Sequence, residues 1–162
     1  DSMKVIYEPF DLTEVAGEVL RETQMIDQSH VFSAQWVLPV PVWADLGLIK
    51  QALRVLVDNA IKYTPQGGRI TIRAEGADGL ARLSVEDEGQ GIDGDSLPHI
   101  FDRFYRTDES RARQTGGTGL GLSIAKWIAD RHGGWFEVIS WPEVGTRITL
   151  VLPLAAMKDG EA

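Results

Sequence analysis

The sequence predicts an α+β fold, with helices on one face of a mixed or antiparallel sheet. The first observation is that "GRITIRAEG" and "GLARLSVEDEG" alternate apolar and polar residues on either side of a short turn. The second is that "WFEVISW" and "GTRITLVLP" repeat this hairpin pattern near the end of the chain. The third is helical periodicity in the segments between them. A length of 162 residues without repeats favours one domain.

The elements follow one another as helix, strands, helix, hairpin, glycine-rich loop, helix, hairpin. Residues 10–26 form a helix that Asp11 can cap, and residues 31–40 form a strand. The clearest helix begins after Asp45, repeats apolar residues at intervals of three and four, and ends at Pro65. Residues 95–104 form short turns, residues 105–120 a mobile loop and residues 121–131 a helix.

Composition excludes several classes of function. Hydrophobic residues make up 43% of the chain and charged residues 25%, which is typical of a globular protein. The net charge of −8 argues against nucleic-acid binding. The sequence contains no cysteine, so disulfides and thiolate zinc sites are excluded, and this fits a cytosolic protein. It contains no apolar run of the ~20 residues that would span a bilayer.

Four glycines between Gly116 and Gly121 directly precede the last predicted helix, and three interpretations are open. A Walker A loop fails because Leu122 stands where the phosphate-binding lysine belongs. A dinucleotide fingerprint, "GQGIDG", begins at Gly89 after a strand. Neither the long helix nor the second strand with a ribose-binding acid follows it, so this interpretation is also weak.

The third interpretation takes both glycine clusters together. The loop before the last helix would wrap phosphates with backbone N–H groups, at the positive end of the helix dipole. Asp87, at the end of a strand, would accept a hydrogen bond from an exocyclic amine such as that of adenine. Gly89 and Gly91 would let a purine lie close to the backbone. One cluster therefore recognises a base and the other its phosphates.

Five segments follow one another along the chain, at 58–64 ("DNAIKYT"), 87–92 ("DEGQGI"), 101–106 ("FDRFYR"), 116–122 ("GGTGLGL") and 145–153 ("GTRITLVLP"). In this order they resemble the N, G1, F and G2 boxes and the closing strand of the catalytic, ATP-binding domain of bacterial sensor histidine kinases. The resemblance covers nearly the whole chain. It implies a Bergerat fold, a two-layer α/β sandwich with three helices on one face of a mixed sheet of about five strands, and a flexible ATP lid. We assign residues 1–154 to this domain and residues 155–162 to a polar tail.

The resemblance also assigns roles. Asn59 would bind Mg²⁺ through its amide oxygen, Lys62 would reach a phosphate and Tyr63 would pack on the adenine ring. Arg106, helped by Arg103, would meet the phosphates. The full set of ATP-binding residues expected from the motifs is Asn59, Lys62, Tyr63, Asp87, Gly89, Gly91, Ile92, Phe104, Arg106, Gly117, Thr118, Gly119, Leu120, Gly121, Leu122 and Thr146.

The resemblance predicts the transfer of the γ-phosphoryl group from Mg–ATP to a histidine on a separate dimerisation domain in two-component signal transduction. Related ATPases have a water-activating glutamate four residues before the magnesium asparagine, where this chain has Val55. Val55 also departs from the polar residue common in histidine kinases, so an ATP-binding pseudokinase or scaffold is the alternative. We expect a monomeric, cytoplasmic domain, part of a longer receptor that signals to a response regulator.

Overall fold

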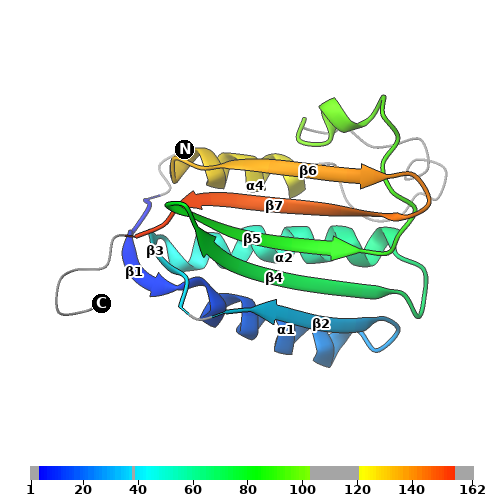
Figure 1. Ribbon diagram of the computed structural model, residues 1–162, viewed down its shortest axis with the longest axis horizontal. Coiled ribbons are helices and arrows are strands. Elements are labelled where there is room, and N and C mark those ends of the chain that lie inside the picture. The colour runs from blue at the N-terminus through cyan, green and yellow to red at the C-terminus, as the bar shows by residue number, and fades with distance from the viewer. Residues whose placement is uncertain (1–3, 38, 103–120, 156–162) are drawn as a thin grey trace.

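A five-stranded mixed sheet forms one layer of the domain (Figure 1). The computed structural model describes residues 4–37, 39–102 and 121–155. The strands lie in the order β2-β4-β5-β7-β6. β2 and β4 pair in parallel and the other neighbours pair antiparallel, so the expected mixed sheet is confirmed. Their bounds are β2 Val31–Trp36, β4 Arg69–Ala77, β5 Leu80–Asp87, β6 Trp135–Trp141 and β7 Gly145–Pro153.

Three helices cover one face of this sheet, as the sequence predicts (Figure 1). They are α1 (Leu12–Ile26), α2 (Leu46–Tyr63) and α4 (Gly121–Arg131). Asp11 caps α1 by accepting from the N–H of Thr13, and Asp45 caps α2 by accepting from the N–H of Leu48. Each cap satisfies a backbone donor that the first turn of a helix leaves unpaired.

A small second sheet is the part of the fold that the sequence does not predict. β1 (Glu8–Asp11) and β3 (Pro41–Ala44) form an antiparallel pair. Each has only four residues and contains a proline, and prolines interrupt the pattern by which strands are recognised. The strand predicted over residues 31–40 was too long, since β2 ends at Trp36, before Pro39. The short turns expected after residue 95 include the 3₁₀ helix η1 (Leu97–His99).

The core lies between the helices and the inner face of the sheet. Alternate residues of the strands, such as Ile72, Leu83 and Leu150, are fully buried against Leu53 and Leu56 of α2. Each such side chain contributes about 1.5–3 kcal/mol relative to an exposed one. The C-terminus of α2, the end of β5 and the start of β7 all lie at one end of the sandwich (Figure 1). The N box, the G1 box and the start of the closing strand therefore converge at this end.

Candidate nucleotide site

The last turns of α2 carry three residues of the expected site. Asn59, Lys62 and Tyr63 are half-buried there. The helix ends because Pro65 disfavours helical dihedrals at Thr64, which is extended with φ −105° and ψ 128°. The Thr64 carbonyl accepts a 2.8 Å hydrogen bond from Nε2 of His30. This end of the helix is thereby fixed to the segment between α1 and β2.

Two glycines shape the turn that follows β5. A Cβ atom at Gly89 would lie closer than 3.0 Å to the carbonyl oxygen of Tyr63. A Cβ at Gly91 would lie closer than 3.0 Å to the carbonyl oxygen of Trp141, and Gly91 has φ +77°. L residues with a side chain rarely adopt this conformation. The turn at 89–91 is therefore wedged between the end of α2 and the β6–β7 hairpin, and both positions require glycine.

Asp87 is the last residue of β5 and points its carboxylate into this junction. Oδ1 accepts a 2.8 Å hydrogen bond from the N–H of Gly89. Burial raises the pKa of Asp87, and the backbone N–H groups of Gly89 and Thr146 oppose the rise without cancelling it. The nearby carboxylate of Glu86 raises the pKa further. The site thus holds a carboxylate whose charge is incompletely compensated by the protein.

The β6–β7 hairpin forms the back of the turn. Thr146 pairs with Asp87 across β5 and β7. Its hydroxyl lies 2.8 Å from Oγ of Ser140, and that Oγ accepts a 2.7 Å hydrogen bond from the N–H of Ile92. Sequence reasoning missed Ser140. The available signal was that Ser140 continues the inward-facing row of Phe136 and Val138 in β6 and is its polar member.

The start of α4 lies against α2. A Cβ at Gly121 would lie 3.3 Å from Cγ1 of Val55, and Leu122 packs against the core. Asn59 follows Val55 by four residues, so both lie on the same face of α2. The structure therefore brings the N box and the end of the G2 box together. Six expected site residues lie outside the described residues: Phe104, Arg106, Gly117, Thr118, Gly119 and Leu120.

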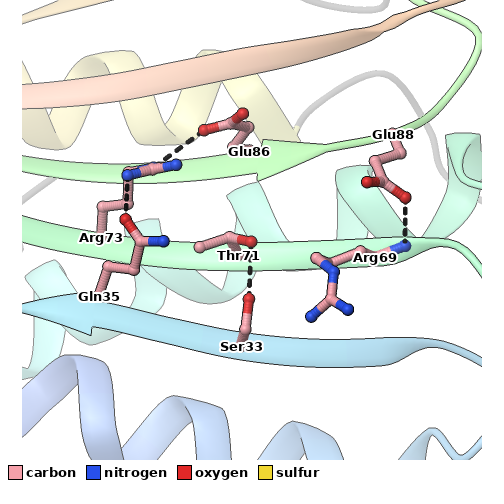
Figure 2. Close-up of a pocket in the computed structure, with 7 residues that line it drawn as sticks. All are labelled: Ser33, Gln35, Arg69, Thr71, Arg73, Glu86 and Glu88. Carbon is pink, nitrogen blue, oxygen red and sulfur yellow. Dashed lines mark hydrogen bonds and ion pairs between the residues drawn. The ribbon is translucent and has the colours of Figure 1, made fainter.

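A separate polar groove of about 360 Å³ lies on the outer face of the sheet, away from the helices (Figure 2). Its groups bond mainly to one another. Arg73 pairs with Glu86 and with Gln35, and the hydroxyls of Ser33 and Thr71 lie 2.7 Å apart.

Within residues 4–37, 39–102 and 121–155, no three histidines or acidic residues are grouped as metal ligands. In the same ranges, the helices are all too short or too polar to cross a membrane.

Comparison with known proteins identifies the family and the fold. Residues 44–156 match the family described as "Histidine kinase-, DNA gyrase B-, and HSP90-like ATPase". The chain belongs to this family. Within it, the similar proteins are sensor histidine kinases, and the domain is a histidine-kinase catalytic domain with the Bergerat fold.

Three relatives of this histidine-kinase domain illustrate the match. The sensor histidine kinase YkoH of Bacillus subtilis is 45% identical over 148 residues, which cover 91% of this chain and 32% of YkoH. The mycobacterial sensor histidine kinase MprB superimposes with a TM-score of 0.82 at 32% identity, covering 94% of this chain and all of that one. Histidine kinase ThkA in complex with response regulator TrrA gives a TM-score of 0.78 at 29% identity, covering 93% and 42%. The chain thus spans about a third of YkoH.

Proposed function

We propose that this domain binds Mg–ATP and donates the γ-phosphoryl group to a histidine on a separate dimerisation and phosphoacceptor domain, in two-component signal transduction. Family membership supports the ATP-dependent part. The observation that carries the assignment is the position of Asp87. Its carboxylate ends β5 in a partly buried junction, beside two glycines that let the turn pack against the end of α2 and the β6–β7 hairpin.

Adenine would bind at Asp87. A carboxylate has about four acceptor positions, and the N–H groups of Gly89 and Thr146 take two of them. The exocyclic amine of adenine can donate a hydrogen bond to one of the remaining acceptor positions of the carboxylate. Tyr63 at the end of α2 and Ile92 after the turn offer apolar surface to the ring.

The phosphates would extend from Asp87 toward the start of α4. The first turn of a helix carries unpaired N–H groups and a partial positive charge, which suits phosphate oxygens. Gly121 and Leu122 begin α4 beside the face of α2 that carries Val55 and Asn59. Lys62 adds a positive charge on the last turn of α2.

Asn59 is the residue that would hold Mg²⁺. Its amide oxygen is a hard ligand, and the described residues offer no acidic cluster besides. This fits magnesium in nucleotide sites, where the ion takes one or two protein ligands and completes its shell with phosphate oxygens and water. When bound, the ion neutralises charge on the transferring phosphoryl group.

Transfer rather than hydrolysis is expected because Val55 can neither take a proton nor orient water. The histidines of this chain are poorly placed as acceptors. His30 bonds to Asp27 and to the Thr64 carbonyl, and His132 bonds to the Asp45 N–H and the Ile128 carbonyl. His99 lies in η1 beside Asp102. The acceptor histidine is therefore expected on another domain.

The wider setting follows from the relatives. The complex of ThkA with TrrA supports a response regulator as the downstream partner. YkoH is about three times longer than its match to this chain, which supports a longer parent receptor. We place the domain in the cytoplasm, where ATP is available, and expect the isolated domain to be a monomer.

Nucleotide titration followed by phosphotransfer tests the proposal. The domain is first titrated with ATP, with and without Mg²⁺. It is then mixed with the dimerisation domain of its parent receptor and radiolabelled ATP. The proposal expects magnesium-dependent binding, little free phosphate from the domain alone, and acid-labile label on the added domain. Tight binding without transfer would favour the pseudokinase or scaffold instead, and an absence of ATP binding would refute both.

A further inference from the structure

We propose that Ser140 is a positioning residue for the adenine subsite, because its hydroxyl holds the turn after β5 against the β6–β7 hairpin. The inference rests on the proposed function, since it concerns how Asp87 is presented to the base. Ser140 is the next-to-last residue of β6, on the face of the sheet that the helices cover, and it is half-buried.

The hydroxyl of Ser140 joins two segments that the chain separates by about 50 residues. Oγ accepts a 2.7 Å hydrogen bond from the N–H of Ile92, 48 residues earlier. The same Oγ lies 2.8 Å from Oγ1 of Thr146 and 3.4 Å from the carbonyl oxygen of Gly145. Because a hydroxyl has one donor and two acceptor positions, Ser140 can serve the Ile92 N–H and donate its own proton to Thr146 or Gly145.

Two of the partners of Ser140 belong to segments that contact Asp87. Thr146 lies directly opposite Asp87 in the β5–β7 pair, and its N–H lowers the pKa of that carboxyl. Ile92 closes the turn whose Gly89 N–H bonds to Asp87 Oδ1. A hydroxyl that fixes Thr146 on one side and the turn on the other therefore limits the directions in which the carboxylate can point.

Further contacts between turn and hairpin are made by the main chain. The N–H of Glu143 donates to the carbonyl of Gln90, and Gly91 packs on the backbone of Trp141 and Pro142. Side-chain substitution leaves these contacts in place. Substitution of Ser140 can consequently loosen the turn without altering the residues assigned to the nucleotide itself.

The test compares Ser140→Ala with Ser140→Thr, which keeps the hydroxyl, and with Ser84→Ala as a matched control. Ser84 Oγ lies 2.8 Å from Thr149 Oγ1 between β5 and β7, on the outer face of the sheet and away from the turn. The dissociation constants of ATP and of inosine triphosphate, which lacks the exocyclic amine, are measured by calorimetry. Thermal unfolding and hydrogen exchange at the Ile92 amide are recorded without nucleotide.

We expect Ser140→Ala to weaken ATP binding about three- to tenfold, the effect of one hydrogen bond, and to reduce the preference for ATP over inosine triphosphate. Exchange at Ile92 should accelerate. Ser140→Thr should restore both properties, and Ser84→Ala should leave the preference unchanged even if it lowers the melting temperature. If Ser140→Ala fails to fold, Ser140→Cys gives the same comparison with a weaker acceptor.

Two outcomes would overturn the inference while leaving ATP binding intact. One is an unchanged preference for ATP in a folded Ser140→Ala protein. The other is an equal loss of affinity for both nucleotides that Ser84→Ala reproduces at equal loss of stability, which would make Ser140 merely structural. Failure of the unsubstituted domain to bind ATP would instead refute the proposed function, and the inference with it.

Discussion

The carbonyl oxygen of Tyr63, the last residue of α2, occupies the space into which a side chain at position 89 would project. The N–H of Gln90 donates to the same carbonyl over 3.3 Å. The end of the helix and the turn after β5 are thus locked together through backbone atoms, and this contact joins two motifs that lie about 25 residues apart in the chain.

Substituting Gly89 should break this junction. In Gly89→Ala, the new methyl group meets the Tyr63 carbonyl at under 3.0 Å, so the turn or the helix end must move. We expect a loss of about 1–3 kcal/mol of unfolding free energy, typical of overpacking, together with loss of ATP binding. Urea denaturation and calorimetry measure the two effects. Gly94→Ala is the control, because a Cβ at Gly94 meets no atom within 4 Å, and it should resemble the unsubstituted protein.

Asp87→Asn should weaken ATP binding and reduce base selectivity. The substitution replaces a charged acceptor by an amide, so the hydrogen bond to the adenine amine loses its ionic component. Hydrogen bonds to charged groups contribute about 1.5–3 kcal/mol, and we expect ATP to bind roughly tenfold to hundredfold less tightly. Competition titration with GTP measures selectivity. An unchanged ratio of ATP to GTP affinity would contradict the adenine assignment.

The same substitution should have the opposite effect on the stability of the free domain. Burial raises the pKa of Asp87 above its unfolded value, so folding favours the protonated carboxyl. The contribution of the protonated Asp87 carboxyl to the free energy of unfolding is fully present below the ordinary carboxyl pKa. It is lost as the pH rises through the raised pKa of the folded state. The Asp87→Asn side chain cannot ionise, so this variant does not lose stability as the pH rises. The melting temperature of the variant should exceed that of the unsubstituted domain at pH 7 but not at pH 3.5. A lower melting temperature at pH 7 would contradict this account.

The side-chain hydroxyl of Thr64 is the buried side-chain polar atom for which the described structure provides no hydrogen-bond partner. An unpaired buried hydroxyl costs about 1–3 kcal/mol, whereas an apolar group of the same shape has no such cost. Thr64→Val should therefore stabilise the domain, by about 1 kcal/mol in urea denaturation. Thr71→Val is the matched control, because the Thr71 hydroxyl lies 2.7 Å from that of Ser33, and this variant should be destabilised.

Asp27 should contribute stability that disappears in acid. Burial would raise its pKa, but hydrogen bonds from Ser29 and His30 outweigh burial and lower it overall. The stabilisation is then present above the unfolded carboxyl pKa and is lost as the pH falls through the lowered folded pKa. Asp27→Asn should lower the melting temperature at pH 7, and the difference should shrink toward pH 3. Asp130→Asn, which breaks an exposed pair with Lys126, should change little at either pH.

The elements with strong periodicity could be predicted from sequence. α2 and the two hairpins have long, regular patterns and clear caps or turns, and α4 was placed at residues 121–131 as the structure has it. The pair β1–β3 could not be predicted, because each strand is four residues long and its partner lies at least 30 residues away. Asp87 could be singled out because a carboxylate at the end of an apolar strand is unusual. Ser140, despite its inward-facing position in β6, and His30 were missed, since their roles depend on partners 48 and 34 residues distant in the chain.

Helix α2 joins the two ends of the domain as a single rod. Its first turn is tied to the amino-terminal segment, because the Asp45 carboxylate accepts from the N–H of Ile6, and its last turn holds the junction with Gly89. Eighteen helical residues separate these attachments by about 27 Å. Because residue 6 is attached to this helix, a fluorescent label placed near it would follow the position of the nucleotide end of the domain within a larger assembly. The label would lie far from the groups assigned to ATP.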